Sequence, residues 1–159
     1  MKEKTCCFTG HREIPENEHE AIQKRLESET ADLIHQGVTE FRAGGALGFD
    51  TMGALAVLKL KKRFPRIKLI LILPHWEQPD KWSEHDRTRY AVIRTQADEV
   101  IYTSWPYRGG CMYRRNRRLA DGSGFCICYL TKSSGGTAYT VNYAERKGVR
   151  IINIAAEKN

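Results

Sequence analysis

Two hydrophobic patterns alternate along this chain of 159 residues. Short runs are apolar at nearly every position, as at 67–73, which is typical of strands covered on both faces. Longer segments between them place apolar residues at helical spacing, as at Ile22, Leu26 and Leu33, and Gly37 marks the end of that helix. The expected strands are 6–9, 40–43, 67–73, 99–103, 125–130 and 149–154, and the expected helices are 18–36, 50–63, 83–97, 112–121 and 138–147.

This regular exchange of strand and helix predicts an α/β fold, in which a mainly parallel sheet lies between helices in a three-layer sandwich. Neither an internal repeat nor an interdomain linker is visible, so residues 1–159 are expected to form a single domain. The alternation defines the fold class but leaves the strand order open. In such folds ligands bind beyond the carboxyl ends of the strands, so the loops that follow strands are the places to search for function.

The composition is ordinary for a globular protein, with 41% apolar and 28% charged residues. No apolar run reaches the ~18 residues that a membrane-spanning helix needs. The first residues lack the apolar stretch and cleavage site of a signal peptide. We therefore expect a cytoplasmic protein without a membrane segment.

The five cysteines are interpreted as reduced core residues, because buried thiols are common in strands. Cys6 and Cys7 fall in the first expected strand, and Cys111 in an expected loop. Cys126 and Cys128 share one face of a later strand, which raises the idea of a metal site. No Cys-x-x-Cys or His-x-His spacing supports that idea, so no metal site is expected.

The formal net charge is +7, from 26 basic and 19 acidic residues, and favours an acidic partner. Part of the excess is local, since four arginines flank Asn116 within 114–118. Such a run is compatible with a solvated helix face, with contacts to a nucleotide phosphate, or with a nucleic-acid backbone. The aromatic residues are not interleaved with these arginines along the chain, as a base-stacking platform would require.

The loop at 131–137 carries the most specific signal, because it joins a strand to a helix and consists mainly of small and hydroxyl residues. Ser134, Gly135, Gly136 and Thr137 lie where the helix begins. Glycine permits close approach, and a helix start leaves backbone N–H groups unpaired, so the loop suits a phosphate. A simple helix cap is the alternative, and it uses the same groups.

A second glycine loop follows the expected strand at 40–43 and contains Gly44, Gly45 and Gly48. It matches neither the dinucleotide fingerprint nor the phosphate loop of nucleotide hydrolases. A tight turn into a closely packed helix is therefore as good a reading as ligand binding. Asp50 at the helix start could cap that helix or accept hydrogen bonds from ribose hydroxyls.

A third loop, Thr9-Gly10-His11-Arg12, follows the first strand and adds positive charge. Three such turns at one edge of a sheet predict a single phosphate-bearing ligand. The tryptophans Trp76, Trp82 and Trp105 lie in or next to the loops after the third and fourth strands. They suit either core packing or stacking on a base.

These motifs together resemble the SLOG superfamily, which includes the DNA-processing protein DprA and the Lonely Guy enzymes, and within it the YpsA-like branch. The resemblance extends from residue 5 to about 154 and includes Pro74 followed by Gln78 and Trp82, then Tyr107 and Arg115-Asn116. It implies a Rossmann-like fold with a nucleotide-binding pocket. The residues expected to contact the ligand are Thr9, Gly10, His11, Arg12, Gly44, Gly45, Gly48, Asp50, Gln78, Trp82, Arg115, Asn116, Ser134, Gly135, Gly136 and Thr137.

Binding of a nucleotide-derived ligand, with a regulatory role, is the leading hypothesis, and no other cofactor is expected. In Lonely Guy enzymes a glutamate assists glycosidic cleavage, whereas Thr140 stands at the corresponding position and cannot act as a carboxylate. A nucleoside-phosphate hydrolase would therefore need His11, Asp50 or Glu84 as its acid or base. The kinship with DprA adds single-stranded DNA binding as a further alternative. The resemblance is also compatible with a homodimer and with a protein partner.

Overall fold

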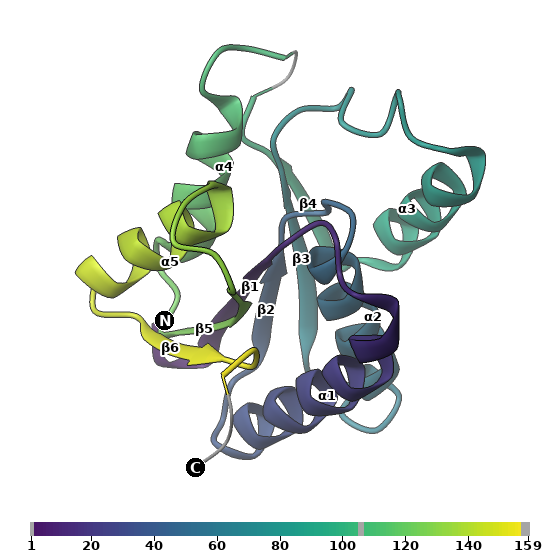
Figure 1. Ribbon diagram of the computed structural model, residues 1–159. Helices are drawn as coiled ribbons and strands as arrows, with labels where there is room; N and C mark the ends of the chain where they lie inside the picture. Colours follow the sequence, from purple (N-terminus) through teal and green to yellow (C-terminus); the bar gives the residue numbers. More distant parts are fainter. Residues whose placement is uncertain (1, 105–106, 157–159) are drawn as a thin grey trace.

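The computed structural model describes residues 2–104 and 107–156, and shows a central sheet with helices on both faces (Figure 1). Its strands are β1 (Thr5–Gly10), β2 (Glu40–Ala43), β3 (Lys68–Leu73), β4 (Glu99–Tyr102), β5 (Phe125–Tyr129) and β6 (Arg150–Asn153). Its α-helices are α1 (His19–His35), α2 (Phe49–Lys61), α3 (Glu84–Gln96), α4 (Cys111–Ala120) and α5 (Gly136–Arg146), and short 3-10 turns occupy η1 (Lys2–Lys4) and η2 (Glu16–Glu18).

All six described strands are parallel, in the order β4-β3-β2-β1-β5-β6. The strand β1 lies in the middle, where Cys7 is opposite Arg42 of β2 on one side and Cys126 of β5 on the other. The chain proceeds outward from β1 to β4 and then returns to the other side of β1. This reversal makes the carboxyl ends of β1 and β5 the expected place for a ligand in a Rossmann-like sheet.

The helices form two layers, with α1, α2 and α3 on one face of the sheet and α4 and α5 on the other (Figure 1). Successive residues of β1 point into different cores, because side chains alternate along a strand. Phe8 packs with the α1–α3 layer, whereas Cys7 packs with the α4–α5 layer. The uninterrupted apolar run of β3 is explained in the same way, since Leu71 and Ile72 lie in opposite cores.

The predicted elements are all present, and their ends differ from the prediction by at most two residues. Ser83 caps α3 as expected, because its Oγ accepts a hydrogen bond of 3.1 Å from the Asp86 N–H. Asp50 does not cap α2, whose N-cap is Gly48. The helix α5 begins two residues earlier than predicted, at Gly136, since Gly135 supplies the positive φ of +99° that turns the chain into it.

The cysteines are all buried and free, as the interpretation of reduced core residues requires. Cys111 does not lie in a loop, however, because it is the first residue of α4 and faces the interior. Across 2–104 and 107–156, no three His, Cys, Asp or Glu side chains converge to hold a metal ion. In the same ranges no helix is long and apolar enough to span a membrane. Trp105 lies outside the described residues.

Candidate functional site

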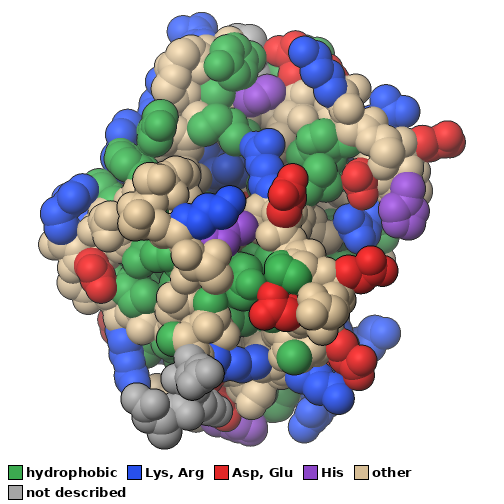
Figure 2. Space-filling view, viewed as in Figure 1, with side chains coloured by type: hydrophobic (Ala, Val, Ile, Leu, Met, Phe, Trp, Pro, Cys, Tyr) green, Lys and Arg blue, Asp and Glu red, His purple; other side chains and the backbone are tan. Residues whose placement is uncertain are grey.

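A pocket of about 640 Å³ opens where the carboxyl ends of β1 and β5 meet, at the reversal of strand order. Figure 2 shows a hollow in the centre of this face, with Lys, Arg and His side chains gathered around it. The volume lies within the range of about 300–1,000 Å³ that small-molecule sites occupy. Its lining is Thr9, Gly10, His11, Arg12, Glu13, Ala46, Asp50, Met112, Tyr113, Arg115, Asn116, Leu119, Lys132, Ser134, Gly135, Gly136 and Thr137.

His11 connects the loop after β1 to the loop after β5. Its Nε2 accepts a hydrogen bond of 2.9 Å from the Thr131 N–H, which requires an unprotonated Nε2. Partial burial, and then the charge of Lys132, lower the pKa of His11, so the neutral ring with its proton on Nδ1 is favoured. His11 therefore positions the two loops against each other, and the cations of the pocket are Arg12, Lys132 and Arg115.

The N-terminus of α5 forms one wall of the pocket through Ser134, Gly135, Gly136 and Thr137. The first backbone hydrogen bond of this turn runs from the Tyr139 N–H to the Gly135 carbonyl, at 3.0 Å. The N–H groups at the start of a helix have no intrahelical acceptor, and together with the helix dipole they attract anions. Thr137 is buried, whereas the three residues before it are exposed to the pocket and solvent.

A buried pair of opposite charges, Asp50 of α2 and Arg115 of α4, forms the floor of the pocket, and each side chain is only 5% exposed. Arg115 donates from Nη1 to the Gly44 carbonyl and from Nε to Asn116 Oδ1, at 2.9 Å for the latter. Asp50 Oδ2 accepts from the Ala46 N–H at 3.3 Å. Both side chains thus have fixed partners inside the protein.

Burial dominates the ionisation of this pair. It raises the pKa of Asp50 to about 6, although Arg115, the Ala46 N–H and Arg12 favour the carboxylate. Burial also lowers the pKa of Arg115, and the charge of Asp50 opposes that change. A carboxyl group that titrates near neutrality and borders a pocket can exchange a proton with a bound molecule.

The glycines of the second loop pack behind the pocket and are absent from its lining. A β-carbon on Gly44 would lie 2.6 Å from Arg115 Nη1 and 2.9 Å from Asp50 Oδ2, so this glycine lets the charged pair converge above it. A β-carbon on Gly48 would lie 2.2 Å from the Arg12 carbonyl oxygen. Gly44 and Gly48 are therefore closely packed, and only Ala46 and Asp50 of this region face the pocket.

Gln78 and Trp82 lie outside the pocket lining, next to Gly45 and Tyr90. The half-buried Trp82 packs against the core and makes an edge-to-face contact with Tyr90, with ring centroids 5.3 Å apart. Glu84 is exposed at the start of α3 and is likewise absent from the lining. Of the three acid or base candidates, His11 and Asp50 border the pocket and Glu84 does not.

Sequence reasoning missed six lining residues: Glu13, Ala46, Met112, Tyr113, Leu119 and Lys132. A signal for some of them was present, because residues 112, 115, 116 and 119 have the spacing of one helix face. Lys132 belongs to the loop already singled out. The sequence could not show that Tyr113 borders the pocket, since this depends on how α4 and α5 pack.

Comparison with known proteins agrees with this arrangement. A sequence model described as the YspA SLOG family matches residues 6–157. A UPF0398 protein of Halalkalibacterium halodurans is 33% identical over 129 residues, which cover 79% of this chain and 68% of that protein. The UPF0398 protein YpsA of Bacillus subtilis is 26% identical over 129 residues, covering 79% and 72% respectively.

Among solved structures, DprA from Helicobacter pylori, described with its single-stranded DNA binding mode, aligns with a TM-score of 0.66 at 15% identity. DprA from Streptococcus pneumoniae aligns with a TM-score of 0.65, also at 15% identity. The alignments cover 94% and 92% of this chain but only 64% and 48% of those two proteins. At this identity the likeness shows a shared fold.

Proposed function

From the premise that this chain belongs to the YspA SLOG family, we propose that its pocket binds a nucleotide or a nucleotide-derived ligand in order to sense or sequester it. One observation carries the proposal: the N-terminus of α5 and the cations Arg12, Lys132 and Arg115 border one pocket at the reversal of strand order. Backbone N–H groups and cations of this kind bind phosphate.

The site favours binding over turnover, because Thr140 cannot replace the missing glutamate. This side chain is 0% exposed, and its hydroxyl donates to the Gly136 carbonyl at 2.9 Å. It therefore supports the first turn of α5 from inside.

Native mass spectrometry of the freshly purified protein, followed by mass analysis of what it releases on denaturation, tests the proposal directly. We expect a mass with the composition of a nucleotide or its derivative. A protein that purifies empty and binds no member of a nucleotide panel by calorimetry contradicts it.

Gly136→Asp tests the location of the site. Position 136 has open space for a side chain, and its nearest neighbour would be Asn116 Nδ2, at 3.9 Å from an added β-carbon. An aspartate there repels phosphate but suits a helix N-terminus, so we expect nucleotide affinity to fall at least tenfold while thermal stability is retained. The control Gly136→Ala adds the same β-carbon without charge and should bind within about threefold of wild type. Equal binding by all three proteins would place the ligand elsewhere.

Hydrolysis of a nucleoside phosphate is a second candidate, favoured by the pocket position and raised pKa of Asp50. Incubation with a nucleotide panel and chromatography for released base measures it. Turnover by wild type that is lost in Asp50→Asn would establish the activity. Turnover by wild type that is no greater than that of Gly136→Asp would exclude it.

Single-stranded DNA binding is a third candidate, because a DprA with this fold is described with such a binding mode. A DNA backbone neutralised by several cations predicts a steep loss of affinity with salt, whereas a small nucleotide in a pocket predicts a mild one. Titration of a short oligothymidylate at two salt concentrations separates these cases.

A further inference from the structure

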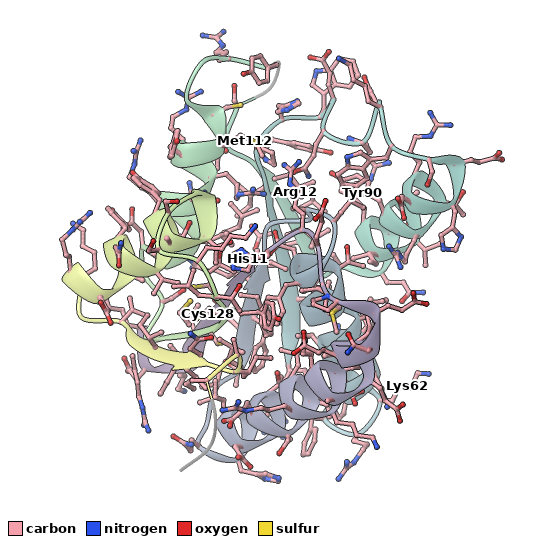
Figure 3. The ribbon with its side chains drawn as sticks, in the orientation of Figure 1. His11, Arg12, Lys62, Tyr90, Met112 and Cys128 are labelled. Atoms are coloured by element: carbon pink, nitrogen blue, oxygen red, sulfur yellow. The ribbon has the colours of Figure 1, made fainter. Side chains whose placement is uncertain are left out.

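The pocket has an apolar side that phosphate binding does not use. Met112, Tyr113 and Leu119 of α4 contribute it, while the N-terminus of α5 and Lys132 supply the polar side. In Figure 3, Met112 lies on α4 above His11, and Arg12 is next to it on the segment after β1. A ligand that fills this pocket therefore needs one apolar part and one anionic part.

Tyr113 is the prominent feature of the apolar side. It is 50% exposed although it borders a pocket, and in the described ranges no other Tyr, Phe or Trp belongs to the lining. An exposed aromatic ring in a concave site retains a face on which a flat group can stack.

The ring of Tyr113 is also held in place. Tyr139 of α5 contacts it edge-to-face, with centroids 4.8 Å apart and an angle of 72° between the planes. The Tyr139 hydroxyl in turn accepts a hydrogen bond of 3.0 Å from Arg117 Nη1. Because these contacts fix the ring before a ligand arrives, stacking on it costs little side-chain entropy.

The helix that carries this ring packs against the helix that starts at the anion-binding turn. Asn116 lies three residues after Tyr113, which corresponds to about 4.5 Å along a helix. The amide of Asn116 is 3.9 Å from where a β-carbon of Gly136 would be. Tyr113 and the start of α5 therefore border one pocket from adjacent helices, so that a single ligand can contact both.

We infer that Tyr113 is a specificity-determining residue that stacks on the base of the ligand while the turn at Gly135 and Gly136 holds its phosphate. The inference rests on the proposed function and narrows it to ligands that carry a nucleobase on a phosphorylated sugar. A sugar phosphate without a base fills the polar side alone and is expected to bind more weakly.

The test compares AMP with ribose 5-phosphate by calorimetry, using the wild-type chain, Tyr113→Ala and Tyr113→Phe. Base–aromatic stacking of the usual strength predicts that Tyr113→Ala weakens AMP about 5- to 100-fold. Ribose 5-phosphate should bind wild type and Tyr113→Ala equally, and Tyr113→Phe should retain AMP within about threefold. Saturation-transfer NMR should show contacts to the adenine protons that are lost in Tyr113→Ala.

Each alternative outcome has a distinct meaning. Equal affinity of wild type for AMP and ribose 5-phosphate, or unchanged AMP binding by Tyr113→Ala, overturns the stacking role and leaves phosphate binding intact. An equal loss of both ligands in Tyr113→Ala would show a structural role and overturn it as well. Failure of wild type to bind either compound contradicts the proposed function itself.

Discussion

Asp50 and Arg115 are both charged groups and both buried, and these two properties conflict. The carboxylate and the guanidinium are both buried, which costs free energy, and their attraction offsets that cost only in part, since the pKa of Asp50 is raised to about 6. Other partners, among them the Gly44 carbonyl and the Ala46 N–H, hold the pair at the pocket floor. Carboxyl groups with a perturbed pKa are concentrated at functional sites, which makes Asp50 a candidate for the chemistry of this pocket.

This predicts an unusual dependence of stability on pH. The pKa of Asp50 is raised from 3.8 to about 6 in the folded protein, so the folded state binds the proton more tightly than the unfolded state. The contribution of Asp50 to the unfolding free energy therefore falls as pH rises from about 4 to about 6. Relative to wild type, Asp50→Asn should gain on the order of 2–3 kcal/mol across this window.

Urea denaturation of both proteins at several pH values measures the difference, and Asp98 supplies a control of opposite sign. Burial alone would raise the pKa of Asp98, but hydrogen bonds from Lys61 and the Leu69 N–H outweigh it and lower that pKa. The stability that Asp98 contributes is thus lost as pH falls, so the difference in unfolding free energy between wild type and Asp98→Asn should shrink as pH falls. A flat difference between Asp50→Asn and wild type would contradict the burial argument.

At the scale of elements, the contact between the loop after β1 and the start of α2 shapes the pocket. Gly48 precedes α2 with a φ of +78°, and the Phe49 N–H donates to the His11 carbonyl at 3.1 Å. The loop after β1 is thereby held directly against the start of α2. Because His11 also contacts Thr131, one short segment positions both walls.

Gly48→Ala should therefore lower the stability of the protein more than an alanine substitution at a positive-φ glycine usually does. The substitution adds backbone strain and a clash, since its β-carbon would lie 2.2 Å from the Arg12 carbonyl oxygen. We expect a loss of about 3–5 kcal/mol. Gly37→Ala is the matched control, because Gly37 has a φ of +105° but nothing within 4 Å of an added β-carbon, and should cost about 1–2 kcal/mol.

Chemical denaturation of the two variants separates the two sources of the stability loss, namely backbone strain and the clash with the Arg12 carbonyl. A loss in Gly48→Ala that only equals the loss in Gly37→Ala would show that the contact with the Arg12 carbonyl yields easily. Crystallography of Gly48→Ala should show the loop after β1 displaced from α2.

At the scale of the whole molecule, the sheet order unites segments that are far apart in the sequence. His11 and Thr131 are separated by 120 residues and are joined by a hydrogen bond at the pocket. The site depends on the complete fold, so occupation of the site should stabilise the complete fold by linkage.

With AMP at 100 times its dissociation constant, linkage predicts about 2.7 kcal/mol, which corresponds to a rise in Tm of about 5–10 °C for a domain of this size. Differential scanning calorimetry measures the shift, and Gly136→Asp at the same AMP concentration should show at most about half of it, because a tenfold weaker affinity reduces the linkage to about 1.4 kcal/mol. A rise of similar size in that variant would mean that AMP stabilises the protein from another site.

Much of the architecture was readable from the sequence because it depends on neighbours along the chain. Apolar runs such as that of β3 predict strands, and Ser83 predicts a helix start, through interactions within a few residues. The loop at Gly135 and Gly136 was recognised for the same reason, since small residues before a helix have a local effect on the backbone.

The tertiary structure alone decided what these elements bring together. It set the strand order, placed the glycines Gly44 and Gly48 behind the pocket, and brought Asp50 and Arg115 together on its floor. It also set Tyr139 between Tyr113 and Arg117, although Tyr139 is 22 residues from Arg117 along the chain. Such contacts join residues far apart in sequence, and they are determined by the packing of whole helices on the sheet, which no local pattern records.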